Sequence, residues 1–161
     1  MNAPLTPSYT NEVSAEYLRT LNKSVFTEEQ LAGFSEETLA IFRKQQAYTA
    51  AHPPIGIFRL ATEGSQTQRG GVVKKTQSFL TFTLDNGQEV NAAHKGDYVM
   101  YSDGTTAQIV TGAGQSNSDY ALVGSRLSNG DEIINTLQGC GLWVERNGVP
   151  MADDFLPPVD S

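Results

Sequence analysis

The feature that most constrains the fold is a repeat of about thirty residues that occurs three times after Phe58. Each repeat contains a glycine, a small polar residue, any residue and a β-forming residue, followed by a second glycine and a short apolar run. The three repeats begin at Gly64-Ser65, Gly96-Asp97 and Gly124-Ser125. Glycine beside a polar residue occurs at turns in any β protein. Three such pairs in phase, each followed by the same pattern, favour a true repeat.

The chain after His52-Pro53-Pro54 reads as short strands separated by glycines. The β-forming runs are residues 55–60, 71–73, 79–84, 107–110, 133–134 and 142–144. Asn86-Gly87 follows the third run and predicts a tight hairpin, because these residues tolerate the positive φ angles that such a turn requires. Asn147-Gly148 predicts a second turn of this kind. The fold expected for residues 55–156 is therefore mainly β.

The residues before the prolines are expected to form a helical arm. Ser14 precedes one helical segment, and Thr27 with Gln30 matches a capping box. Ser35 precedes a longer helix that runs toward Ala50, and the prolines end it. One modest apolar stripe near heptad spacing consists of Leu31, Phe34, Ile41 and Tyr48. Such a stripe suits either docking on another surface or packing against the chain's own domain, and the sequence leaves both open.

Charge and cysteine content exclude several classes of function. Among 161 residues the net charge is -7 and the isoelectric point is near 4.7, so a phosphate backbone would be repelled and nucleic acid is not an expected partner. Cys140 is the only cysteine, which rules out a disulfide within the chain and a zinc site of several cysteines. We find no signal peptide and no apolar run that could span a membrane. We therefore expect a soluble protein made in the cytoplasm, without stable membrane anchoring.

The second repeat and its neighbours carry a resemblance to a known family. Asn86-Gly87 leads to Asn91-Ala92-Ala93-His94 and then to Gly96-Asp97. The third repeat begins with Ala121-Leu122-Val123-Gly124-Ser125, and residues 61–73 and 147–152 look like a first and a final copy. This ordered set resembles the PAAR family, the small cone-shaped proteins that cap the spikes of type VI secretion systems and related contractile injection machines. Asn91 and His94 replace the proline and arginine that give the family its name.

The resemblance implies an architecture and a function. We expect a helical arm and proline linker at residues 1–54, a small cone-shaped PAAR-like domain of short strands at 55–156, and a tail at 157–161. The partner would be a trimeric valine-glycine repeat (VgrG-like) spike protein, capped by one tip per trimer. The role would be membrane piercing and effector delivery, and the machine would carry the protein out of the cell without a signal peptide. The helical arm would bind an effector or adaptor, or solubilise its own domain.

The positions where many family members bind zinc are altered in this chain. By motif they are Arg69, the turn around Tyr101 and Asp103, and Asn129, none of which supplies an imidazole or a thiolate. Structural zinc needs four good donors, mostly of these two kinds. We therefore expect no zinc and no other cofactor. As a hypothesis, Arg69, Asp103 and Asn129 converge and form a charge-assisted staple at the apex in place of the metal. The alternative is that these are three unrelated residues of surface turns.

Two other functions stand as alternatives. Cys140 lies between glycines and could be the nucleophile of a hydrolase or effector if the fold brought a base such as His94 close to it. A buried structural cysteine is the more common case, and we expect no catalytic residue. The chain could also be a free carbohydrate-binding β module.

Overall fold

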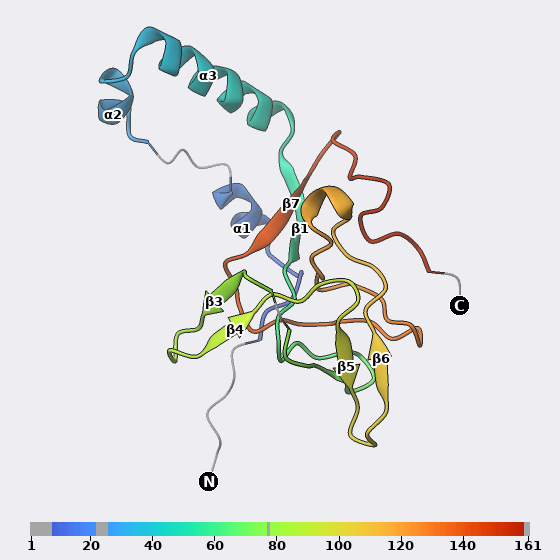
Figure 1. Cartoon of the computed structure of the whole chain (residues 1–161). Coiled ribbons are helices and arrows are strands. Elements are labelled where there is room, and N and C mark those ends of the chain that lie inside the picture. The colour runs from blue at the N-terminus through green and yellow to red at the C-terminus, as the bar shows by residue number, and fades with distance from the viewer. Residues whose placement is uncertain (1–7, 22–25, 77, 160–161) are drawn as a thin grey trace. The chain divides into compact units, whose positions relative to one another are not determined.

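The computed structural model describes residues 8–21, 26–76 and 78–159. Its helices are α1 (Ala15–Thr20), α2 (Glu28–Ala32) and α3 (Glu36–Ala51), with a 3-10 turn η1 (Gln115–Asn117). Its strands are β1 (Pro54–Arg59), β2 (Val72–Val73), β3 (Thr81–Thr83), β4 (Glu89–Asn91), β5 (Tyr98–Met100), β6 (Thr106–Gln108) and β7 (Leu142–Arg146). The three α-helices precede the strands along the described chain (Figure 1). The class is mixed α/β with more strands than helices, so the predicted order of helices followed by strands is confirmed in this coarse form.

The chain divides into two compact units that are not contiguous in sequence. Unit 1 consists of residues 1–11, 58–143 and 151–161, and unit 2 of residues 12–57 and 144–150. In the part of the chain that the structure describes, no helix is long and apolar enough to cross a membrane.

The helices of unit 2 begin where the capping residues predict. The Ser14 hydroxyl accepts a hydrogen bond from the backbone N–H of Tyr17 at the start of α1. Thr27 and Gln30 form the complete capping box of α2, each side chain accepting from the other residue's backbone N–H. These interactions satisfy N–H groups that have no partner within the helix, which is why the sequence signals were reliable.

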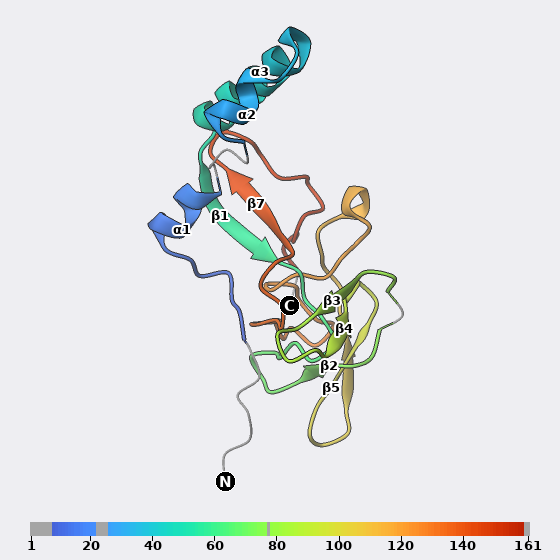
Figure 2. The ribbon, with the colours of Figure 1, turned by 90° about the vertical axis from the view of Figure 1, so that its left-hand side faces the viewer.

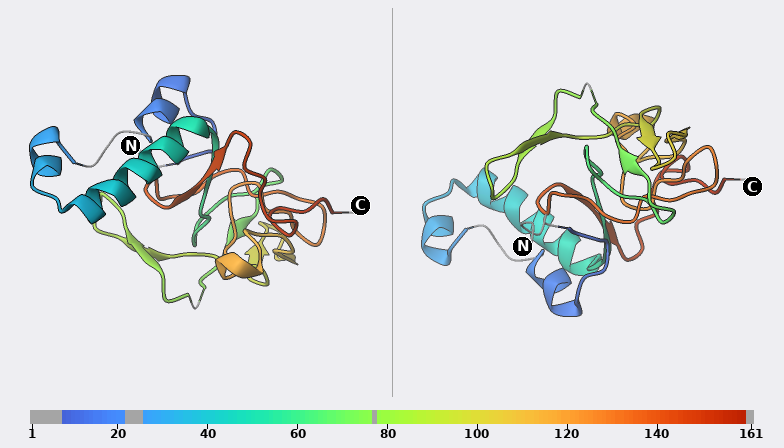
Figure 3. Two further views of the ribbon diagram at one scale, coloured as in Figure 1. Left: turned by 90° about the horizontal axis from the view of Figure 1, so that it is seen from above. Right: turned by 90° about the horizontal axis from the view of Figure 1, so that it is seen from below.

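The predicted apolar stripe of the helical arm does not form one packed face. Leu31 is buried and Phe34 is half-buried, whereas Ile41 is 72% exposed and Tyr48 is 44% exposed. Phe26 packs edge-on against the rings of Phe34 and Phe42. Figure 3 shows α2 lying at the N-terminal end of the long helix α3. The short α2 thus covers only one end of α3, and no residue of α3 is fully buried.

Two small antiparallel elements lie outside the repeats, one formed by strands before and after all three and one between the first and second. Strands β1 and β7 form a two-stranded sheet (Figure 2), and β3 pairs with β4 with Phe82 opposite Val90. The Asn86-Gly87 hairpin predicted from the sequence is confirmed, and its loop has three residues. Leu84 donates its N–H to the carbonyl of Gln88 across three loop residues, and Gly87 alone has a positive φ, of 86°. Loops of three residues commonly combine a type I turn with one left-handed residue, as here.

The three repeats close into a ring of strand segments. These segments are residues 65–68, 71–74, 97–101, 105–110, 125–128 and 131–134, and each is hydrogen-bonded to the next in this order. The last segment pairs with the first, through the bridge between Thr67 and Ile133. We call this closed arrangement the repeat ring. Because it closes, it has no lateral edge to which another strand could add.

Hydrogen bonds between repeats follow a threefold cyclic pattern. Ala93 donates its N–H to the carbonyl of Ala61 (2.9 Å), Ala121 to Ala93 (2.8 Å) and Ala61 to Ala121 (2.9 Å). A second cycle of three bonds joins the same repeats. In it the backbone N–H of Lys74 donates to the carbonyl of Tyr98 (3.0 Å), that of Val110 to Arg126 (2.9 Å) and that of Ile134 to Gln66 (2.9 Å). The sequence repeat is therefore a structural repeat with pseudo-threefold symmetry.

The core of unit 1 lies inside this ring. The three alanines are fully buried, and so are apolar residues at equivalent positions of the repeats, Val73, Ile109 and Ile133, with Val99 and Leu127 beside them. A second apolar cluster contains Leu60, Ala92, Ala113, Leu122 and Phe155. The suggested final copy near residues 147–152 does not add a fourth repeat to the ring. After Asn147-Gly148 no strand follows in the described residues, and Phe155 forms its β-bridge with Gly112, which is outside the ring segments.

Candidate functional site

The residues that defined the repeat in the sequence have one structural role each. Gly64, Gly96 and Gly124 have positive φ angles of 86°, 100° and 107°, a conformation that glycine adopts at little cost. The polar residue that follows accepts a hydrogen bond from the backbone N–H three residues before it. These bonds are Thr62 to Ser65 (2.9 Å), His94 to Asp97 (2.7 Å) and Leu122 to Ser125 (2.9 Å). The repeat motif is therefore a turn motif that starts each hairpin of the ring.

The second glycine of each repeat marks one end of the ring. There the chain reverses at Arg69-Gly70, Asp103-Gly104 and Asn129-Gly130. In each turn the glycine N–H donates to the carbonyl three residues earlier, at 3.0 Å, 3.0 Å and 2.9 Å. We call this the turn end of the repeat ring. All the residues of the hypothetical staple belong to these three turns.

A polar cluster lies at the turn end, centred on Asp131. This side chain is only 2% exposed, and its carboxylate accepts a hydrogen bond from the Tyr101 hydroxyl (2.5 Å) and another from the backbone N–H of Arg69 (3.1 Å). The Asn129 amide donates to the Tyr101 hydroxyl (3.0 Å), and the Arg69 guanidinium donates to the Asn129 carbonyl (2.9 Å). The Thr67 hydroxyl also bonds to the carboxylate. Five residues of all three repeats thus meet here, and we call them the Asp131 cluster.

Of the three residues in the staple hypothesis, Arg69 and Asn129 are in contact, and the contact is through the backbone carbonyl of Asn129. In the described residues Arg69 is not in an ion pair with Asp103. Asp103 is exposed and accepts hydrogen bonds from Thr105 within its own turn (2.9 and 2.6 Å). A carboxylate two residues before a backbone N–H commonly closes such a turn locally. The acid that joins the turns is Asp131.

Sequence reasoning missed Asp131 and Thr67, and it named Tyr101 only as part of an altered zinc position. A signal for Asp131 was present, because it follows Gly130 directly and occupies the place of Gly71 in the first repeat. A charged residue at a position that points into the ring indicates a partner inside it, since buried carboxylates are rarely left unpaired. Tyr101 gave no comparable signal.

The protonation equilibria of the cluster reflect these bonds. Burial alone would raise the pKa of Asp131, but hydrogen bonds from the hydroxyls of Thr67 and Tyr101 outweigh it. Backbone N–H groups of Glu132 and Arg69 add to this effect, so the pKa lies below the ordinary value of 3.8. For Tyr101, burial and the bond to the Asp131 carboxylate raise the pKa above 10.0. At neutral pH the cluster therefore holds an ionised carboxylate and a neutral phenol.

Stability should therefore decline at both extremes of pH. The folded-state pKa of Asp131 is lowered, so its contribution to stability is complete above pH 3.8. This contribution is lost as the pH falls through the folded-state pKa. The folded-state pKa of Tyr101 is raised, so its contribution to stability is complete below pH 10.0. This contribution is lost as the pH rises through the folded-state pKa. Urea unfolding followed by Trp143 fluorescence should show a smaller alkaline decline in Tyr101→Phe. The exposed control Tyr98→Phe should keep the full decline, and equal declines in both variants would contradict the assignment.

The cluster does not fit the zinc ion that the family resemblance implies. Its side chains facing one another are a guanidinium, an amide, a phenol, a hydroxyl and one carboxylate, and the first two present N–H groups that donate hydrogen bonds. Zinc prefers thiolate and imidazole. Among the described residues, no three His, Cys, Asp or Glu side chains are grouped so that they could hold a metal ion.

The residues considered for catalysis lie in different surroundings. Cys140 is exposed, and its backbone N–H donates to the Gln138 side chain (2.9 Å). The His94 ring stacks on Tyr120 with 4.5 Å between centroids, and Tyr120 is 6.3 Å from Trp143. In the described chain no hydrogen bond joins Cys140 to His94.

Comparisons of the chain with protein-family models, with curated proteins and with solved structures found no match.

Proposed function

We propose that the chain is a spike-tip protein that caps a trimeric, VgrG-like β-helical spike. The observation that supports this is the threefold cycle of hydrogen bonds through Ala61, Ala93 and Ala121. A single chain normally has no symmetry to offer a trimer. Here three equivalent hairpins surround one axis, so one chain presents three similar sets of backbone groups to three identical subunits.

The closed ring also limits how such a partner is bound. Since every strand segment of the ring has a neighbour on both sides, the spike cannot add a strand laterally. Contact has to be made end-on, where the ladders of a β-helical partner continue those of the ring. This mode uses backbone hydrogen bonds and depends little on side-chain identity.

The proposed role requires rigidity and no turnover. The ring interior is filled mostly by small and β-branched side chains, and hydrogen bonds of the Asp131 cluster join its three turns at the turn end. Contraction of the machine would carry such a tip out of the cell. Membrane piercing and effector delivery follow from this role, with no enzymatic step.

Binding to an isolated spike tests the proposal. The probe is the purified β-helical end of a trimeric valine-glycine repeat spike protein, immobilised and titrated with the full chain. We expect saturable binding, and none to a trimeric coiled coil that has the same symmetry without exposed β ladders. Equal binding to both trimers, or to neither, would contradict the proposal.

A further inference from the structure

The three outer faces of the repeat ring have the same backbone and different chemistry. The first face is formed by β2 and β5 and displays Val72, Lys74, Tyr98 and Met100. The equivalent positions of the second face are Gln108, Val110, Arg126 and Ser128, and those of the third face are Glu132, Ile134, Gln66 and Gln68. The β2–β5 face carries three large apolar side chains, and each of the others carries one. End-on capping of a trimer gives no reason for this difference.

The apolar side chains of the β2–β5 face lie together on its outer surface. Val72 is directly opposite Met100 across the strand pair, and the N–H of Lys74 donates to the carbonyl of Tyr98 (3.0 Å). Because side chains alternate along a strand, Val73 and Val99 point into the core while their neighbours point outward. Val72, Tyr98 and Met100 are 37%, 55% and 39% exposed. They form one contiguous apolar strip rather than scattered surface residues.

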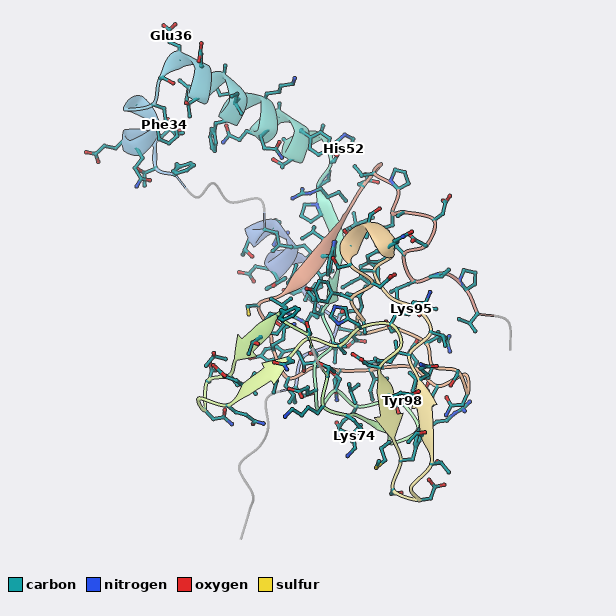
Figure 4. The ribbon with its side chains drawn as sticks, viewed as in Figure 1. Phe34, Glu36, His52, Lys74, Lys95 and Tyr98 are labelled. Atoms are coloured by element: carbon teal, nitrogen blue, oxygen red, sulfur yellow. The ribbon has the colours of Figure 1, made fainter. Side chains whose placement is uncertain are left out.

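Positive charge surrounds this strip in an otherwise acidic chain. Lys74, Lys75 and Lys95 are three of the five lysines of the chain, and all three are exposed. None forms an ion pair within residues 8–21, 26–76 and 78–159. Lys74 lies next to Tyr98, as the backbone hydrogen bond between them shows, and both are labelled in Figure 4; Lys95 lies three residues before Tyr98 in the chain.

The nearby carboxylates are used elsewhere. Asp97 accepts from the backbone of His94, and Glu63 accepts from the backbones of Asn91 and Thr76. Among the outward positions of β2, β5 and β6 there is no acidic residue. With exposed lysines beside it and no acidic residue at these outward positions, the face favours a negatively charged occupant.

We propose that the β2–β5 face is the docking surface for an acidic amphipathic helix of a partner protein. A sheet face with exposed apolar side chains is typically covered by a helix, and strand addition is excluded because the ring is closed. The apolar stripe of the helix packs on Val72, Tyr98 and Met100, and its carboxylates lie near the lysines. This site is separate from the end of the ring that would contact a spike, so one tip can hold one cargo or adaptor on its side.

A synthetic helix tests this proposal without any spike protein. The probe is a fluorescent 14-residue peptide with leucines at helical positions i, i+3, i+4 and i+7 and glutamates elsewhere, titrated into the full chain. We expect binding that weakens as salt rises, because the charge contribution is screened. Tyr98→Ser should raise the Kd at least about tenfold, since aromatic anchors dominate such interfaces. Ile134→Ser, an exposed apolar residue of the third face, should leave the Kd unchanged.

Three results would overturn the proposal. The first is an absence of binding by the wild-type chain, and the second is equal binding of a peptide in which lysine replaces every glutamate. The third is an equal loss of affinity in Tyr98→Ser and Ile134→Ser, which would place the peptide elsewhere. Sedimentation of the free chain distinguishes a further case: a dimer that Tyr98→Ser dissociates would show that a second copy covers this face. Circular dichroism of both variants shows whether they fold.

Discussion

Replacing Ile133 with alanine should lower the free energy of unfolding of unit 1 by about 2–5 kcal/mol. Ile133 is fully buried at the centre of the repeat ring, and its backbone holds the third repeat against the first through the bridge to Thr67. The substitution removes buried apolar surface and leaves a cavity among side chains from all three repeats. Because the ring closes, its strand segments cannot move inward independently to fill that cavity.

Ile134 is the matched control for this measurement. It is the same residue type, one position later in the same repeat, and is 40% exposed on the outer surface. Ile134→Ala should cost less than about 1 kcal/mol. Urea unfolding followed by the fluorescence of Trp143, the only tryptophan, reports on unit 1. Similar losses in the two variants would show that the side-chain alternation described for the ring is wrong.

Replacing Asp131 with alanine should lower the same free energy by about 2–4 kcal/mol. The carboxylate accepts hydrogen bonds from Tyr101, Thr67 and the backbone of Arg69 inside the turn end. Its removal leaves the buried Thr67 hydroxyl and the partly buried Tyr101 hydroxyl and Arg69 N–H without this acceptor. An unsatisfied buried donor costs more than a hydrogen bond contributes. The loss should shrink below pH 3.8, where the wild-type carboxylate begins to lose its own contribution.

Asp103 is the control for Asp131, because it was the carboxylate that the sequence placed in the staple. Its bonds are confined to Thr105, and it is exposed. Asp103→Ala should change the unfolding free energy by about 0.5 kcal/mol or less. If Asp103→Ala proved as costly as Asp131→Ala, the Asp131 cluster would not be what closes the turn end.

Local signals in the sequence predicted local structure well. The capping residues Ser14, Thr27 and Ser35 each precede a helix of the structure, because a cap is satisfied by a backbone N–H only three residues away. The glycine and polar pairs of the repeat predicted turns for the same reason, since the acceptor at Ser65, Asp97 or Ser125 lies three residues after its donor.

Partners across the ring could not be predicted in this way. Asp131 meets Tyr101, which is 30 residues earlier, only because the second and third repeats are neighbours around the axis. Asp103 was a candidate because its turn matches a position where many members of the resembled family bind zinc, but in this turn Thr105 satisfies the carboxylate locally. Whether the apolar stripe of the helical arm packs on its own unit could not be predicted either, and in the described residues Ile41 and Tyr48 remain exposed.

The residues that distinguish the three outer faces are in the sequence. Which of them share a face becomes clear only from the register of the paired strands. Val72 and Met100 belong to different repeats, and their pairing follows from the antiparallel ladder between β2 and β5. Once the ring is known, equivalent positions can be compared residue by residue. The same comparison shows which features all repeats share, such as the positive-φ glycines, and which belong to one repeat, such as Asp131.

The proposal that one pseudo-threefold chain caps a threefold partner is tested most directly by the stoichiometry of the complex. Native mass spectrometry of the full chain with the trimeric β-helical spike end gives this number without assumptions about shape. The threefold cycle through Ala61, Ala93 and Ala121 predicts a complex of one chain per three spike subunits, even with the chain in excess. A complex with three chains per trimer would mean that each subunit binds its own copy, and would contradict the account.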